Sequence, residues 1–328
     1  MPAAVDAPEE TLLTSAATSF SQQSTKVKDL FSIPPPLKKL FDKVPVLVYS
    51  PNPLPQRTPK SARIPSLYVF STAKDAAAGR PSFNPTCLKW QVSLDGCGIG
   101  RGEETDAQLQ TFLNIAGVDH RLISSNNHAS PTGVLPFLLP TVHASASFQD
   151  SILPIPSNKL VKFATEHGAK VQESPSMRYE AYQSLLDHRI RNAWLYNLYL
   201  ERENFDAVAY KLYVLPTSTN PFVRASISYD LRIAAEAELL KHAPIIDIDD
   251  LYSEADKAFE ALSVLLGKDT WFFGGEKPAL FDASVFAYTQ LLLDESLGWK
   301  EEKLCRALRR RDNLVQHRQR LLVKYFGG

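Results

Sequence analysis

The sequence has 328 residues, 44% of them hydrophobic, with 36 basic and 36 acidic residues. A chain of this length can bury a large core and is expected to form two domains. Its zero net charge excludes a global field that would attract nucleic acid, so no nucleic-acid partner is expected. The three cysteines, Cys87, Cys97 and Cys305, are scattered, which predicts no disulfide framework and favours a reducing compartment.

Neither a membrane span nor a secretory signal is predicted. No stretch approaches the roughly 20 apolar residues that a spanning helix needs. The N-terminus also lacks a basic region followed by an apolar one. We therefore expect a soluble protein that can still contact a membrane surface.

The N-terminal part divides in two by composition. Residues 1–25 are rich in Ala, Ser, Thr and Gln and are predicted to be disordered. Residues 26–65 carry many prolines between small apolar clusters and are predicted to form an extended arm. Because Leu37, Leu40 and Phe41 lie in this arm, we interpret it as a strap that contacts a partner or a membrane rather than a bare linker.

Residues 66–170 show an alternation of strand and helix patterns. The expected elements are a strand at Leu67–Ser71, a helix from Pro85, a helix at Thr111–Ala116, strands at Asp119–Ser124, Pro136–Leu139 and Ala144–Gln149, and a helix ended by Gly168. A strand–helix–strand unit followed by strand–strand–helix is typical of a thioredoxin-like domain.

Residues 171–328 are predicted to be entirely helical. Tyr182, Leu186, Ile190, Ala193 and Trp194 form one apolar stripe at helical spacing. Ser253-x-x-Asp256 is a capping-box pattern that predicts a helix start, with a stop at Gly267. A helix at Ala283–Leu293 and a single last helix at about Glu301–Tyr325 complete the expected bundle. The predicted fold class is thus α/β followed by all-α.

Four motifs resemble the metaxin family, a branch of the glutathione-transferase-like proteins. They are NNHASPTGVLPFLLP (Asn126–Pro140), QDS (Gln149–Ser151), ALSVLLG (Ala261–Gly267) and WFFGGEKPALFDASVFAY (Trp271–Tyr288). Within the family, the sequence is most similar to the smaller fungal subunits of the mitochondrial sorting and assembly machinery (SAM complex).

The resemblance implies a glutathione-transferase-like fold and a non-enzymatic, peripheral location on the cytosolic face of the mitochondrial outer membrane. It implies a role in protein transport, namely the insertion of β-barrel precursors, whose terminal β-signal the protein would recognise. The implied partners are the β-barrel core subunit, a second metaxin-like subunit, the precursors and the membrane surface.

One segment departs from this family pattern. Residues 92–110 separate CLKWQ from TFLNIAG, two stretches that similar proteins join directly into one helix. We hypothesise that the segment is an intron retained in the gene sequence, and otherwise a glycine-rich surface loop. Sequencing the transcript distinguishes the two. The segment does not match a phosphate-binding G-x-G-x-x-G loop.

Two pairs occupy the positions at which glutathione-binding relatives hold the tripeptide. Leu135-Pro136 matches the residue and proline that supply backbone hydrogen bonds, and Asp150-Ser151 matches the pair that holds the γ-glutamyl end. A turn at a cis-proline and a helix cap explain the same residues without a ligand, and this structural interpretation is favoured.

Catalysis would also need a nucleophile at the start of the first helix. Cys87 is the nearby thiol, and its apolar neighbours favour a buried structural cysteine. Ser82 is the alternative hydroxyl, with no base within sequence reach. We therefore expect no enzyme activity and no cofactor. A glutathione-dependent transferase or thiol enzyme is the alternative, and an adaptor of translation or trafficking is a third hypothesis.

The remaining polar candidates have structural interpretations as well. Asp282 is expected to hold the amides of the preceding loop, because Ala279 cannot complete a reciprocal cap. Arg309, Arg310 and Arg311 make the last helix basic, which indicates either a solvated face or contact with a membrane or acidic partner. His120, His128 and His143 lack companion ligands, so no metal site is expected.

Overall fold

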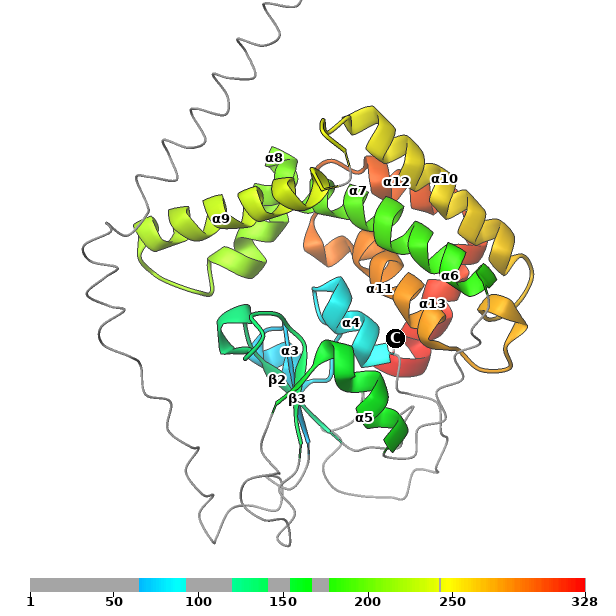
Figure 1. Cartoon of the computed structure of the whole chain (residues 1–328), viewed down its shortest axis with the longest axis horizontal. Helices are drawn as coiled ribbons and strands as arrows, with labels where there is room; N and C mark the ends of the chain where they lie inside the picture. The colour runs from blue at the N-terminus through cyan, green and yellow to red at the C-terminus, as the bar shows by residue number, and fades with distance from the viewer. Residues whose placement is uncertain (1–64, 93–119, 141–153, 167–176, 242, 328) are drawn as a thin grey trace, which may run out of the picture. The chain divides into compact units, whose positions relative to one another are not determined.

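The computed structural model describes residues 65–92, 120–140, 154–166, 177–241 and 243–327 (Figure 1). The predicted arm, the insertion at 92–110 beyond Val92, the helix at 111–116, the strand at 144–149, and Asp150 and Ser151 lie outside these residues. Those predictions therefore stay untested.

The first described part is a four-stranded sheet with the strand order β2-β1-β3-β4. The strands are β1 (Ser66–Val69), β2 (Arg121–Ser124), β3 (Phe137–Leu139) and β4 (Ile155–Pro156). β1 runs parallel to β2 and antiparallel to β3, and β3 runs antiparallel to β4. The short helices of this part are α3 (Ala73–Ala77), η2 (Asn127–Ala129), η3 (Ser157–Lys159), α4 (Pro85–Val92) and α5 (Leu160–Glu166). This arrangement confirms the predicted thioredoxin-like half.

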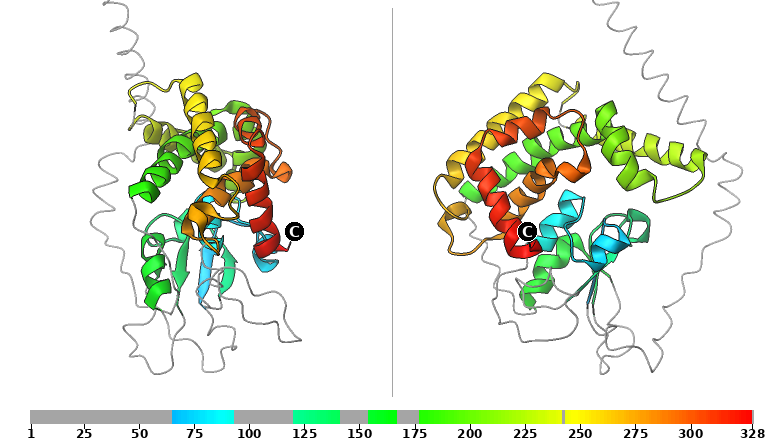
Figure 2. Two further views of the ribbon diagram at one scale, coloured as in Figure 1. Left: turned by 90° about the vertical axis from the view of Figure 1, so that its right-hand side faces the viewer. Right: turned by 180° about the vertical axis from the view of Figure 1, so that it is seen from behind.

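The second part consists of helices joined by loops, with no strand among its described residues (Figures 1 and 2). Its first segments are α6 (Met177–Ser184), η4 (Leu185–Ile190), α7 (Arg191–Leu195), η5 (Tyr196–Leu200), α8 (Arg202–Asn204) and η6 (Phe205–Val214), of which η4, η5 and η6 are π-helical. Its later segments are α9 (Pro221–Leu239), α10 (Ile248–Leu266), η7 (Phe272–Gly274), α11 (Leu280–Leu293), η8 (Glu295–Leu297), α12 (Lys303–Arg309) and α13 (Asp312–Phe326).

The predicted apolar stripe is buried as its periodicity requires. Leu186, Ile190, Ala193 and Trp194 are all buried, and Tyr182 packs against them at the edge. The stripe keeps its spacing although π-helical turns interrupt the α-helix. The helix that precedes Gly267 likewise buries Ala255, Phe259, Leu262 and Leu266.

Two predicted helix boundaries are wrong. α10 does not begin at Ser253: it begins at Ile248, because Asp247 accepts hydrogen bonds from the Asp249 and Asp250 amides and caps the helix one turn and a half earlier. The single last helix is also broken, into α12 and α13. Arg311 leaves helical geometry between them, with φ −111° and ψ 82°.

The core consists of two clusters of buried side chains that meet at α4. Cys87 and Trp90 belong to the cluster beneath the sheet, whereas Leu88 on the same helix belongs to the helical cluster. Phe70, at the end of β1, packs against both. Because one short helix carries side chains into both cores, the start of α4 is held from two sides.

Candidate functional site

The turn before β3 has the geometry that the sequence predicts. The Leu135–Pro136 peptide bond is cis, and Gly133 just before it adopts φ +72°, which favours glycine. The Leu135 amide, which in a glutathione-binding relative would hold the tripeptide, donates to Asn127 Oδ1 at 3.1 Å. In this structure the Leu135 amide is thus already hydrogen-bonded to a side chain of the protein itself, that of Asn127 in η2.

The start of α4 is where a transferase would place its nucleophile. Ser82 is buried, and its hydroxyl donates to the Phe70 carbonyl while accepting from the Asn84 amide at 3.2 Å. The amide of Ser82 itself donates to Gln91 Oε1. The amide and the hydroxyl of Ser82 are therefore both used to join the end of β1 to α4, which gives this hydroxyl a structural role.

Cys87 lies inside α4 and is fully buried. Its burial raises the pKa of the thiol to about 12. Its backbone amide donates to Asn84 Oδ1 at 3.2 Å, so Asn84 provides a side-chain acceptor at the N-terminus of this helix. The thiol is thus protonated near neutral pH and is enclosed, as expected for a structural cysteine.

Aromatic rings cover the same helix start. Phe70, Phe83 and Tyr213 contact one another with ring centroids 5.1–6.1 Å apart, and Tyr199 lies 6.0 Å from Tyr213. The hydroxyl of Tyr213 donates to the Phe83 carbonyl at 3.2 Å and accepts from Asn84 Nδ2 at 3.4 Å. Tyr213 belongs to η6, so a side chain of the helical part covers the start of α4.

Asp282 forms a second buried polar centre, at the start of α11. Its two carboxylate oxygens accept from the Phe272 amide at 3.0 Å and the Ala279 amide at 2.8 Å. This confirms the predicted role in holding the preceding loop. His317 of α13, which sequence reasoning missed, places Nε2 2.8 Å from Asp282 Oδ1, and both side chains are fully buried.

The three consecutive arginines near the break between α12 and α13 differ in role. Arg311 is 9% exposed and pairs with Asp256 and Glu260 of α10, so it is a structural residue rather than a free surface cation. Arg309 pairs with Glu302 at 2.6 Å. Arg310 is exposed at the surface. The predicted contact of this tract with a partner or membrane is untested, and Arg311 does not offer its guanidinium to one.

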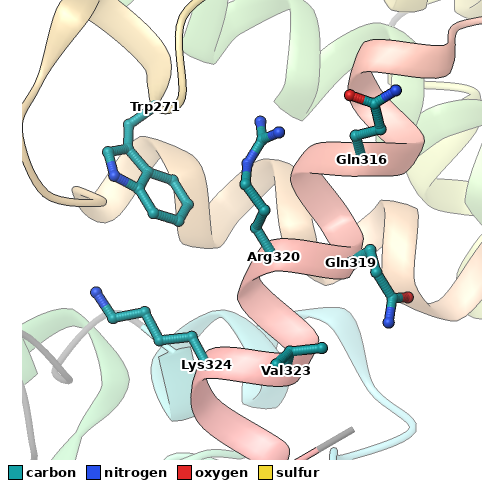
Figure 3. Close-up of a pocket in the computed structure, with 6 residues that line it drawn as sticks. All are labelled: Trp271, Gln316, Gln319, Arg320, Val323 and Lys324. Atoms are coloured by element: carbon teal, nitrogen blue, oxygen red, sulfur yellow. The ribbon is translucent and has the colours of Figure 1, made fainter.

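An open hollow of about 550 Å³ lies beside α13 (Figure 3). It is lined by Trp271, Gln316, Gln319, Arg320, Val323 and Lys324. Arg320 and Lys324 lie 5.9 and 5.5 Å from the centre of the Trp271 ring, in cation–π contact. The polar lining side chains are two cations and two amides, placed around the Trp271 ring.

Metal ligands do not gather in the part of the chain that the structure describes: no group of three His, Cys, Asp or Glu side chains could hold an ion there. His120 is buried at the edge of the sheet domain. The side chains of His128 and His143 fall outside the description. Among the described helices, none combines the length and apolarity that crossing a membrane requires.

The four-stranded sheet, the cis-proline turn and the following helical part define a glutathione-transferase-like protein. Family profiles agree: the glutathione S-transferase N-terminal domain matches residues 107–204, and the C-terminal domain matches residues 255–321. A solved glutathione S-transferase of Ceriporiopsis subvermispora, in complex with glutathione, is 14% identical with a TM-score of 0.43, over 81% of this chain and 99% of that one.

Curated relatives narrow the class. Metaxin-1 of Macaca fascicularis is 28% identical over 243 residues, covering 70% of this chain and 73% of that protein. Metaxin-3 of Danio rerio is 30% identical over 155 residues, covering 44% of this chain and 47% of that protein. The chain belongs to the metaxin family of glutathione-transferase-like proteins, as its motifs predict.

Sequence reasoning missed three residues that decide the character of this site. Asn127 bonds to Leu135 eight residues further along the chain, through the turn before β3. Tyr213 bonds to Asn84, which is more than a hundred residues away. His317 reaches Asp282 across 35 residues. The only local signal was the second asparagine of Asn126-Asn127, which precedes a glycine turn and is a residue type that often bonds to nearby backbone.

Proposed function

We propose that this chain is a non-enzymatic, peripheral subunit of the mitochondrial outer-membrane sorting and assembly machinery. It would act on the cytosolic side, beside the β-barrel core subunit and a second metaxin-like subunit, in the insertion of β-barrel precursors. Membership of the metaxin family supports the setting. The smaller fungal subunit of that machinery is the family member we propose as its counterpart.

One observation carries the non-enzymatic part of the proposal: the groups that a transferase would use are already bonded within the protein. The Ser82 hydroxyl bonds to backbone groups at Phe70 and Asn84, and the Leu135 amide bonds to Asn127. The Cys87 thiol is fully buried with a raised pKa. The fold therefore supports action through surfaces, which is how an assembly subunit works.

The proposed recognition of the precursor β-signal needs an exposed strand edge. β2 and β4 are the edges of the described sheet, and β2 is the longer of the two. An extended segment can add to such an edge through backbone hydrogen bonds, with side-chain pockets giving specificity. We propose β2 as the edge that receives the β-signal.

Co-purification tests the assembly role. The full chain, tagged at its C-terminus, would be recovered from mitochondria solubilised in a mild detergent. We expect the β-barrel core subunit and a second metaxin-like chain in the eluate. Recovery of the tagged chain without a β-barrel core subunit would contradict the proposal, and an unrelated outer-membrane protein carrying the same tag is the control.

Glutathione dependence is the alternative, and the cis Leu135–Pro136 turn is the observation in its favour. Retention of the purified chain on immobilised glutathione, lost in the Asp150→Ala variant, would support it. We expect no retention. The Asn127→Ala variant frees the Leu135 amide. We expect this variant to be retained on immobilised glutathione only if the rest of a glutathione-binding site is intact.

A further inference from the structure

The turn between η6 and α9 exposes apolar side chains at the outer end of a helical hairpin. Phe222 is 84% exposed, Val223 43% and Leu215 38%. In Figure 1 the hairpin projects at the left edge of the helical part, with this turn at its outer end, and the reverse view in Figure 2 agrees. We define the hairpin tip as residues 215–224.

The hairpin tip lies in a part of the sequence without acidic residues. Between Asp206 and Asp230 no aspartate or glutamate occurs, although the chain has 36 acids in 328 residues. The same stretch carries two cations, Lys211 and Arg224. Apolar side chains flanked by cations and free of acids are the pattern of a surface that enters an anionic lipid interface.

The backbone of the tip is bonded by its own side chains. Asn220 Oδ1 accepts from the Phe222 amide at 2.9 Å, and Ser218 Oγ accepts from the Asn220 amide at 3.0 Å. Arg224 donates to the carbonyls of Ser218 and Leu215, and the Thr217 hydroxyl donates to the Val214 carbonyl at 2.7 Å. A loop with its polar backbone satisfied in this way can leave water at little cost.

The shape of the hairpin allows contact without burying the rest of the helical part. Of α9, only Ala235 and Leu239 are buried, both near the C-terminal end of the helix. The first turns of α9 are exposed or half-buried. Because Phe222 lies at the projecting end, it can reach into a bilayer surface while the charged residues near the base stay in water.

We propose that the hairpin tip inserts into the surface of an anionic phospholipid bilayer, with Phe222 as the anchor and Lys211 as a cationic contact for headgroups. The inference rests on the proposed membrane-side function for its setting and names a different surface from the proline-rich arm. Its test, however, uses only purified protein and lipid, so its failure and the failure of co-purification are separate results.

Phe222→Trp is the direct probe. The four native tryptophans, Trp90, Trp194, Trp271 and Trp299, are all buried. An indole at position 222 therefore dominates any change in tryptophan emission that depends on the surroundings of the ring. In the full chain, we expect its emission to shift to shorter wavelength with vesicles of phosphatidylcholine and phosphatidylserine, and to be quenched by brominated acyl chains. Wild-type protein measured in parallel gives the background.

Phe222→Asp should weaken partition into the same vesicles about tenfold or more. The variant lacks the aromatic side chain that the bilayer would bury, and it adds a negative charge that the anionic lipids repel. Lys211→Ser should weaken it about fivefold at low salt and less at high salt. Val264→Asp, at a 71% exposed position on α10, is the matched control and should bind as wild type. Circular dichroism of each variant checks the fold.

Two results would overturn the proposal. One is an unshifted indole at position 222 in the presence of vesicles. The other is an equal loss of partition in Phe222→Asp and Val264→Asp. The emission of the indole could instead shift only when detergent-solubilised mitochondrial proteins are added. In that case the tip is a protein-docking surface and the lipid proposal is wrong.

Discussion

Asp282 and His317 meet at 2.8 Å, Oδ1 to Nε2, in the core of the helical part, with neither side chain exposed. The same carboxylate also accepts from the Phe272 and Ala279 amides. One side chain thus joins α13, the loop at η7 and the start of α11. Its surroundings are aromatic, with the rings of Trp271 and Phe272 5.9 and 5.0 Å from that of His317.

Asp282→Ala should be strongly destabilising, because it leaves the buried Phe272 amide, the part-buried Ala279 amide and the buried His317 imidazole without their partner. We expect a loss of about 3 kcal/mol or more in the free energy of unfolding, measured by urea denaturation at neutral pH. Asp247→Ala removes only the cap of α10 and serves as control, with an expected loss of about 1 kcal/mol. Equal losses in the two variants would contradict this role of Asp282.

Arg311→Met should make the free energy of unfolding less dependent on pH in the acid range. The hydrogen bond and charge of Arg311 lower the pKa of Asp256 below its ordinary value of 3.8. A lowered pKa in the folded state stabilises the protein above the ordinary value, and that stabilisation is lost as pH falls through the lowered pKa.

At neutral pH we expect Arg311→Met to lose about 1–2 kcal/mol, a modest value because Asp256 and Glu260 reach solvent. The difference from wild type should shrink as pH falls below about 4. Denaturation curves at a series of pH values check this, with Arg310→Met as control. A difference that stays constant down to low pH would show that Arg311 acts by packing alone.

Cys87 and Cys305 should resist thiol reagents in the folded protein. Both are buried, and burial raises the pKa of each to about 12. In a Cys97→Ser variant, we expect reaction with Ellman's reagent at pH 8 only after denaturant is added. Release of one equivalent from the native variant within minutes would identify an accessible thiol and reopen the question of thiol chemistry.

Tyr213→Phe should weaken the attachment of the helical part to α4. The substitution removes the hydrogen bonds to the Phe83 carbonyl and Asn84 while keeping the ring contacts. We expect a loss of about 1 kcal/mol in the free energy of unfolding. Tyr210→Phe on the same π-helical segment is the control and should change stability little. A loss of similar size in both variants would mean that the Tyr213 hydroxyl has no special role.

Elements whose cause is local could be predicted from the sequence. Gly267 ends α10 in positive φ, and Asp282 was expected to hold the loop before α11. The two wrong boundaries had competing local signals. Asp247 is a cap as good as Ser253. Arg311, at which the last helix breaks, has its guanidinium bound by acids of α10. Periodicity alone detects neither of these.

The candidate site divides in the same way. The sequence indicated the turn at Leu135-Pro136 and the buried character of Cys87, because glycine, proline and apolar neighbours act within a few residues. The bond from Asn127 to the Leu135 amide and the cover of Tyr213 depend on contacts that only folding creates. The acid-free stretch between Asp206 and Asp230 was visible in the sequence, but its exposure at a projecting tip was not.

By itself, the sequence determined the α/β and all-α halves, since short-range hydrogen bonding and periodicity govern these. Its motifs also indicated the metaxin family. Only the tertiary structure decided whether the polar groups near the cis-proline turn and the start of α4 are free to bind a ligand. The Ser82 hydroxyl and the Leu135 amide are satisfied by groups that the fold brings to them. A buried polar group must find a partner, and which partner it finds depends on how the folded chain brings neighbouring elements together.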